Sequence, residues 1–216
     1  MFVRLSGAPC LVIGGGTIAE RKVVTLLGAQ ARVTVVSPTL TPRLTQLAAA
    51  GEITHWARGY GRDDVRGFRL AFAATDDESL HRAIAADAEA AGVWLNVADR
   101  PQLCSFIVPA TVERGDLTIA ISTGGASPAL AKHLRQQLDQ QFGTEYAQAL
   151  AVLGAVRQRL QTQPRSPAER REILTALVHS GLLEYLRTGQ VEAIDRLLGT
   201  TVGDGASISQ LGVQLD

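Results

Sequence analysis

Residues 10–22 read Cys-Leu-Val-Ile-Gly-Gly-Gly-Thr-Ile-Ala-Glu-Arg-Lys, and this stretch decides the fold. A short apolar run ends in three glycines, and a segment compatible with a helix follows at once. Gly14, Gly16 and Ala19 fit the G-x-G-x-x-G/A pattern of a dinucleotide-binding turn. In that pattern the first glycine makes the turn, the second lets the backbone approach a pyrophosphate, and the small third residue lets the helix pack near the strand. The free N–H groups and positive dipole end of the helix favour a phosphate.

Apolar runs and helical patterns alternate outward from this turn through the first half of the chain. Runs suited to buried strands occur at 9–13, 31–36, 53–57, 70–74 and 93–97, and helical patterns occur at 18–27, 41–50 and 77–91. Strands that alternate with helices imply right-handed crossovers and a parallel sheet covered on both faces. The sequence therefore predicts an α/β fold with a Rossmann-like parallel sheet in residues 1–112.

The pattern changes after residue 99. Strand-like runs at 105–109 and 117–122 flank a turn at 113–116, which indicates a hairpin instead of another βα unit. Ser127 is a natural N-cap for a helix that begins at Pro128. We expect a central hairpin and helix element at 113–145, a small helical domain at 146–200, and a flexible tail at 201–216.

The composition excludes several classes of function. Lys plus Arg and Asp plus Glu both number 21, so no overall charge attracts nucleic acid or an anionic membrane. The two cysteines make no disulfide framework and no C-x-x-C motif. The N-terminus has no signal-peptide pattern, and no apolar run approaches the roughly 20 residues that span a bilayer. We expect a soluble, cytoplasmic protein.

The carboxyl ends of the predicted strands supply the candidate cofactor contacts, because open α/β sheets bind ligands there. A site for NAD usually has an acidic residue about 20 residues beyond the glycines. Here that place holds Ser37, Pro38 and Thr39, so the residues leave NAD and NADP open, and Arg43 could attract a 2′-phosphate. Alternatively this segment is only a strand end. The full set of candidate cofactor-binding residues is Gly14, Gly16, Thr17, Ile18, Ser37, Pro38, Thr39 and Thr75.

Asp99 is the candidate acid–base residue. It follows the predicted strand at 93–97, so its carboxylate would lie at the ligand-binding edge of the sheet. The alternative is a turn or capping aspartate before Arg100. Asn96 either orients a polar group near Asp99 or satisfies backbone at the strand end, and Asp77 is interpreted as the cap of the next helix.

Five motifs, in one order, resemble those of a known family. They are Gly-Gly-Gly-Thr-Ile-Ala-Glu-Arg-Lys (14–22), Ala-Ala-Thr-Asp-Asp (73–77), Asn-Val-Ala-Asp (96–99), Ser-Phe-Ile-Val-Pro-Ala (105–110) and Ser-Thr-Gly-Gly-Ala-Ser-Pro (122–128). The chain resembles the precorrin-2 dehydrogenase and sirohydrochlorin ferrochelatase family over most of residues 1–200.

The resemblance implies NAD-dependent oxidation of precorrin-2, a tetrapyrrole with eight carboxylates, by a homodimer. It also implies the stand-alone form, without a methyltransferase region. Asp99 matches the key aspartate of the family, and the dimer would use part of the helical stripes at 130–142 and 149–160. Many members also insert Fe²⁺, so a second alternative is a bifunctional enzyme in which Fe²⁺ or Co²⁺ is a substrate. A nucleotide-sensing Rossmann module is an alternative from another class.

The loop at 122–128 leads into a helix N-terminus, so it can bind an anion such as a substrate carboxylate. Thr123 stands where the family often has serine. Asn96, Ser105, Thr123, Gly124, Gly125, Ser127 and Lys132 are the candidate substrate-binding residues. No metal site is legible, because the four histidines are scattered without ligand spacing.

Overall fold

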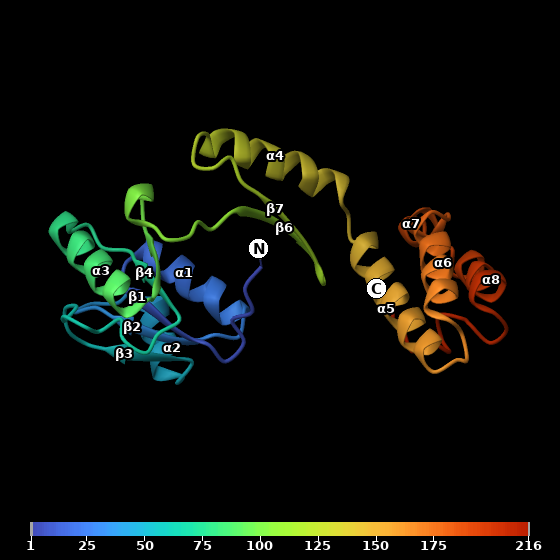
Figure 1. The fold of residues 1–216 in the computed structure, drawn as a ribbon, viewed down its shortest axis with the longest axis horizontal. Helices are drawn as coiled ribbons and strands as arrows, with labels where there is room; N and C mark the ends of the chain where they lie inside the picture. The colour runs from blue at the N-terminus through green and yellow to red at the C-terminus, as the bar shows by residue number, and fades with distance from the viewer. Residues whose placement is uncertain (1, 216) are drawn as a thin grey trace. The chain divides into compact units, whose positions relative to one another are not determined.

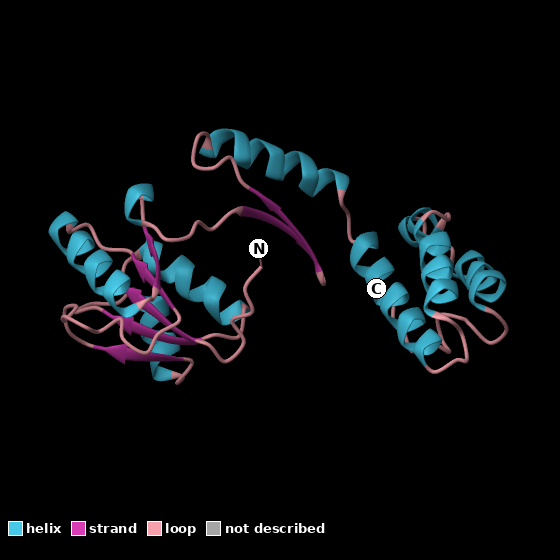
Figure 2. Cartoon of the chain, in the orientation of Figure 1, coloured by secondary structure: helices cyan, strands magenta, loops and turns pink. Residues whose placement is uncertain are grey.

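The computed structural model describes residues 2–215, which divide into two compact units at Val108 and Pro109 (Figure 1). The first unit contains β1 (Pro9–Ile13), α1 (Thr17–Gly28), β2 (Arg32–Val36), α2 (Pro42–Ala49), β3 (Ile53–Trp56), β4 (Leu70–Ala73), α3 (Glu78–Ala91), β5 (Trp94–Val97) and the short 3-10 helix η1 (Pro101–Leu103). The second contains β6 (Ala110–Arg114), β7 (Leu117–Ile121), α4 (Pro128–Gln141), α5 (Glu145–Gln161), α6 (Pro167–Val178), α7 (Leu182–Arg187) and α8 (Val191–Val202) (Figure 2). The division falls four residues before the boundary expected at 112.

The first unit is a doubly wound sheet. Its five strands are all parallel and run in the order β3-β2-β1-β4-β5, as alternating strands and helices predict. On one face α1 and α2 pack Val23 and Leu44 against the sheet. On the other face α3 packs Ile84 and Ala88 against it. The α/β fold predicted from the sequence is therefore confirmed.

The second unit opens with a two-stranded antiparallel hairpin. Arg114 pairs with Leu117, so Gly115 and Asp116 form a two-residue turn, in which Gly115 has φ +56°. The prediction of a strand at 105–109 is wrong. The turn fixes the register, and the residues that pair with β7 are those of β6, which begins at Ala110.

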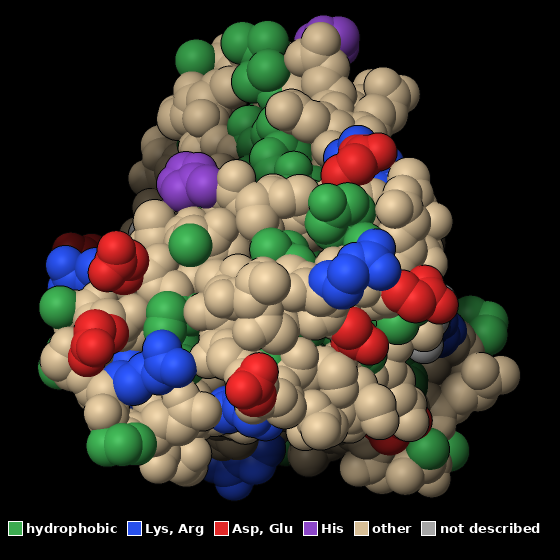
Figure 3. All heavy atoms as spheres, turned by 90° about the vertical axis from the view of Figure 1, so that its right-hand side faces the viewer, with side chains coloured by type: hydrophobic (Ala, Val, Ile, Leu, Met, Phe, Trp, Pro, Cys, Tyr) green, Lys and Arg blue, Asp and Glu red, His purple; other side chains and the backbone are tan. Residues whose placement is uncertain are grey.

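Helices α5 to α8 enclose the second hydrophobic core of the chain. Val156 and Leu160 of α5 pack there with Leu177, Ile194 and Leu198, all fully buried. The apolar stripe at 149–160 therefore belongs to this core. Figure 3 shows acidic and basic side chains interspersed on the face that it displays.

The segment after α8 is not a flexible tail. Ala206 and Ile208 are buried in the helical core, and the backbone N–H of Ile208 donates to Asp195 Oδ1 at 2.7 Å. The expectation of a frayed end is therefore wrong for residues 203–215, because apolar side chains among the small polar ones anchor it. Asp216 lies outside the described residues. None of the helices in residues 2–215 is long and apolar enough to cross a bilayer.

Candidate functional site

The strands of the first unit end in one row at the carboxyl edge of the sheet. Trp56, Val36, Ile13, Ala73 and Val97 are paired in that order across neighbouring strands. The segments that follow them therefore share this edge. Because neighbouring strands lie about 4.8 Å apart and β4 separates β1 from β5, the residues after β5 lie roughly 10 Å along the edge from the glycine turn.

The glycine turn needs two of its glycines for the fold and leaves the third open to a ligand. Gly14 has φ +117°, and a Cβ there would collide with the carbonyl oxygen of Ala74. A Cβ on Gly15 would collide with the carbonyl oxygen of Thr39. A Cβ on Gly16 would meet no atom within 4 Å. Gly16 is the N-cap of α1, and because it has no side chain it occupies none of the first N–H groups of the helix. The first N–H groups of α1 are therefore available, which fits a dinucleotide pyrophosphate.

The loop after β2 is tied to the glycine turn. Thr41 donates its backbone N–H to the carbonyl of Gly15 at 3.0 Å and its hydroxyl to Glu20 Oε2 at 2.6 Å. Ser37 is buried, and its hydroxyl donates to the carbonyl of Thr39 at 2.7 Å. Pro38 and Thr39 are exposed. The Ser37 hydroxyl thus fixes the shape of the loop, while Pro38 and Thr39 form the exposed surface beside the glycine turn.

Thr75 and Asp77 follow β4 at the same edge. The Thr75 hydroxyl accepts the backbone N–H of Asp77 at 3.3 Å. Asp77 Oδ1 accepts the N–H of Leu80 at 3.1 Å and the hydroxyl of Ser79 at 2.6 Å, so it caps α3 as interpreted from the sequence. Those bonds, the Ser79 hydroxyl first, lower the pKa of the Asp77 carboxyl below its ordinary value.

Asn96 and Ser105 lie together at the outer edge of β5. The Asn96 side-chain amide donates to the carbonyl of Phe106 at 3.0 Å. The Ser105 hydroxyl accepts the backbone N–H of Leu95 at 2.7 Å, and the Ser105 N–H donates to the Leu95 carbonyl at 2.8 Å. Residues 105 and 106 are thus held against β5 by one backbone bond and by bonds from the Ser105 and Asn96 side chains. Both side chains stay candidates for substrate contact, with these internal bonds as their present partners.

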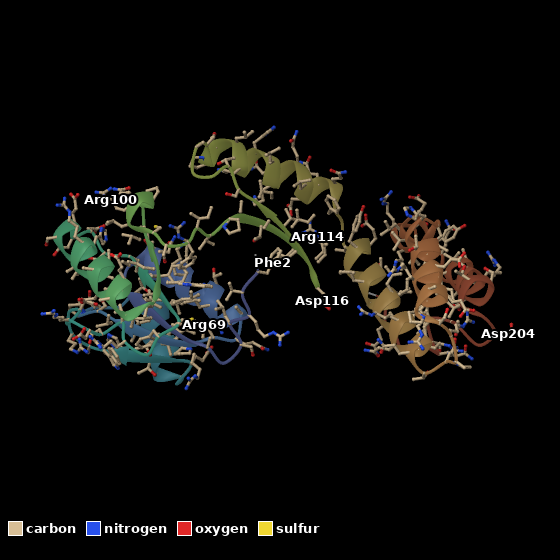
Figure 4. All side chains as sticks on the ribbon, in the orientation of Figure 1. Phe2, Arg69, Arg100, Arg114, Asp116 and Asp204 are labelled. Atoms are coloured by element: carbon tan, nitrogen blue, oxygen red, sulfur yellow. The ribbon has the colours of Figure 1, made fainter. Side chains whose placement is uncertain are left out.

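Asp99 is exposed and has a left-handed backbone conformation, with φ +57°. It lies between β5 and η1, and Figure 4 labels the next residue of this turn, Arg100. The thiol of Cys104 bridges the two sides of this turn: Sγ accepts the N–H of Val97 at 3.1 Å and lies 3.3 Å from the carbonyl of Arg100. Aspartate is one of the few residues besides glycine that visits this conformation readily. The Cys104 thiol therefore acts as a latch that holds the backbone of Asp99.

Sequence reasoning missed Lys22. This side chain projects from α1 over the ring of Phe72 in β4, with Nζ 5.3 Å from the ring centroid. Burial first, and then the neighbouring Arg21, lower the pKa of the Lys22 ammonium below its ordinary value, while the Cys104 thiol and the Asp99 carboxylate oppose this with smaller effects. The available signal was its rarity, because Lys22 and Lys132 are the only lysines in the chain.

The predicted substrate loop belongs to the second unit. The Thr123 hydroxyl accepts the N–H of Ser127 at 3.2 Å and donates to its carbonyl at 3.1 Å, and the intervening Gly124 and Gly125 have positive φ. Ser127 Oγ accepts the N–H of Leu130, so Ser127 caps α4 as predicted. Lys132 is exposed on the same helix. The loop is thus closed by its own hydroxyls.

Within residues 2–215, no three His, Cys, Asp or Glu side chains gather in a way that could hold a metal ion. His55 Nε2 lies 2.9 Å from the carbonyl of Ser37, and His81 is buried in α3. His133 and His179 are exposed. The exposed carboxylate of Asp99, which follows β5, therefore has none of these histidines as a partner.

The chain is similar to several known proteins over most of its length. A family model described as "Putative NAD(P)-binding" matches residues 1–110, and one described as "Sirohaem biosynthesis protein central" matches residues 114–141. A siroheme synthase from Methylobacillus flagellatus is 40% identical over 89% of this chain and 41% of its own length. Another from Thioalkalivibrio sulfidiphilus is 36% identical over 98% of this chain and 43% of its own length. The chain thus spans less than half the length of these relatives. A solved structure titled "SirC, precorrin-2 dehydrogenase" superposes with a TM-score of 0.77 and 26% identity, covering 91% of this chain and 97% of that one.

Proposed function

Because this chain belongs to the NAD(P)-binding family whose model spans residues 1–110, we propose that it is an NAD-dependent dehydrogenase that oxidises precorrin-2 to sirohydrochlorin in siroheme biosynthesis. The names of its relatives and of the solved structure support this proposal. The observation that carries it is the exposed carboxylate of Asp99 at the same sheet edge as the glycine turn.

The oxidation removes a hydride and a proton from the macrocycle and adds one double bond to its conjugated system. A bound oxidised nicotinamide supplies the hydride acceptor. The Asp99 carboxylate accepts the proton and stabilises the positive charge that develops on the macrocycle. Because Asp99 is exposed, it can pass that proton to water. The Cys104 thiol, bonded to backbone on either side of Asp99, fixes the turn from which this carboxylate projects.

We propose NAD as the cofactor. The N-terminus of α1 would bind the pyrophosphate. The exposed Pro38 and Thr39, in the loop that the hydrogen bond from the Ser37 hydroxyl closes, would border the adenosine ribose. Thr17, Ile18 and Thr75 would complete the cofactor contacts at this edge. Arg43 is exposed in the first turn of α2, where it could attract the extra phosphate of NADP. Comparing turnover with NAD and with NADP decides between them.

We propose that the Thr123–Ser127 loop and Lys132 bind carboxylates of the tetrapyrrole, since a helix N-terminus and an ammonium both favour anions. We further propose that α4 forms a homodimer interface. It has no buried residue, and its Leu130 is 48% exposed, although leucines recur along one stripe of it. A second copy of this chain would cover that stripe.

The test is an anaerobic assay that follows NADH formation from precorrin-2. We expect turnover by the wild type and a loss of about 100-fold or more in Asp99→Asn, with the Kd for NAD unchanged, because a positioned general base contributes on that scale. Asparagine keeps the left-handed backbone, so the loss reports chemistry. Normal turnover in Asp99→Asn would refute the assignment. Metal insertion is assayed separately, with sirohydrochlorin and Fe²⁺ or Co²⁺ in the absence of NAD.

A further inference from the structure

The Lys22 side chain is half-buried in the second turn of α1. Its Nζ lies over the Phe72 ring, and that ring packs edge to face against Phe106 with 5.5 Å between centroids. Phe106 follows Ser105 at the outer edge of β5, and its carbonyl accepts the amide of Asn96. Lys22 thus belongs to the group of side chains on the α1-covered face of the sheet next to the Asp99 turn.

The charge of Lys22 has no anionic partner in direct contact. Within residues 2–215 no carboxylate lies within ion-pair distance of its Nζ. Burial first, and then the neighbouring Arg21, lower the pKa of this ammonium, and the smaller opposing effects of Cys104 and Asp99 do not reverse that direction. A partly desolvated ammonium without a counter-ion is costly, and an aromatic face compensates for only part of that cost.

We propose that Lys22 binds a carboxylate of the tetrapyrrole substrate and thereby fixes the macrocycle next to Asp99. This proposal rests on the proposed function. The Phe72 ring holds the ammonium without neutralising it, so the charge remains available to an anion. Lys22 therefore serves as a substrate-binding residue, while Asp99 remains the acid–base group.

The test compares Lys22→Met, which keeps the length and packing of the side chain, with Lys22→Arg, which keeps its charge. Loss of a charge-assisted hydrogen bond should raise the KM for precorrin-2 about ten-fold in Lys22→Met, with kcat and the Kd for NAD little changed. Lys22→Arg should recover most of the affinity. Arg21→Met is the matched control, because Arg21 is exposed on the same helix turn and should show wild-type kinetics.

Equilibrium binding of sirohydrochlorin, followed by its absorbance without NAD, gives a readout that does not depend on turnover. We expect weaker binding by Lys22→Met than by wild type and Lys22→Arg. Equal binding by all variants, or a fall in kcat with KM unchanged, would overturn the role of Lys22. If wild-type protein binds sirohydrochlorin in a Lys22-dependent way but does not oxidise precorrin-2, the dehydrogenase proposal fails and the carboxylate site stands.

Discussion

The two cysteines differ in what their thiols do. Cys10 is fully buried in β1, and burial raises the pKa of its thiol to about 11. Cys104 is half-buried and bonded across the Asp99 turn. The first is a core residue, whereas the second bonds to the backbone of the turn that carries the candidate residue Asp99.

Alkylation should distinguish these two thiols. At pH 8 the Cys10 thiol remains protonated and inaccessible, so iodoacetamide should modify Cys104 alone, as peptide mass spectrometry will show. The adduct removes the latch, and we expect turnover to fall by about ten-fold or more with NAD affinity retained. Cys104→Ser keeps a donor and acceptor and should resist inhibition while keeping most activity. Inhibition of Cys104→Ser by the reagent would contradict the latch.

The glycines of the turn should separate folding from cofactor binding. Gly14→Ala forces a Cβ against the Ala74 carbonyl and should lower the free energy of unfolding by about 2 kcal/mol. Gly16→Val has open space and an extended backbone, so it should unfold like the wild type. Its side chain would block the pyrophosphate and raise the Kd for NAD at least about ten-fold. Tight NAD binding by Gly16→Val, measured by calorimetry, would show that the dinucleotide lies elsewhere.

Lys22 and Cys104 show why part of the candidate site escaped sequence reasoning. The glycine spacing and the position of Asp99 after an apolar run are local signals, and they predict the shared edge of the sheet. The contact of Lys22 with Phe72 joins residues 50 positions apart in sequence, and only the packing of α1 on β4 creates it. The thiol bonds of Cys104 likewise depend on a backbone turn that no residue pattern specifies.

At the scale of elements, the helix caps were the most predictable feature. Asp77 and Ser127, the two caps expected from the sequence, each accept a backbone N–H at the start of a helix. The short oxygen-bearing side chains favoured at N-caps carry that information in the residue itself. Strand pairing depends on a partner strand and not on one residue, and so β6 was expected five residues too early.

The cap of α3 should make part of the stability depend on pH. The folded-state pKa of Asp77 is lowered, so its contribution is present above the unfolded pKa and is lost as pH falls through the folded value. We expect Asp77→Ala to destabilise the protein in urea at pH 7 and to do so less at pH 3. Asp77→Asn, which keeps an acceptor, is the control and should show a smaller difference at pH 7. A pH-independent effect of Asp77→Ala would mean that the carboxylate charge contributes nothing to the cap.

At the scale of the whole molecule, the proposed dimer rests on α4. Leu130→Arg should convert a dimer into a monomer of 22.9 kDa in light scattering, because a charge would be buried against the second copy. Val178→Arg is the matched control: Val178 is 54% exposed on α6, outside the proposed interface. A wild-type protein that is already monomeric would contradict the interface.

The φ of Asp99 narrows what can replace it. Left-handed backbone tolerates aspartate, asparagine and glycine but penalises other side chains by about 1–2 kcal/mol. Substitution of Asp99 by asparagine or by glycine would leave the fold intact and abolish the proposed proton acceptor. A single codon change can therefore yield a protein with the same fold that lacks the proposed proton acceptor, so descendants of this chain should be compared at position 99 before the proposed activity is assigned to them.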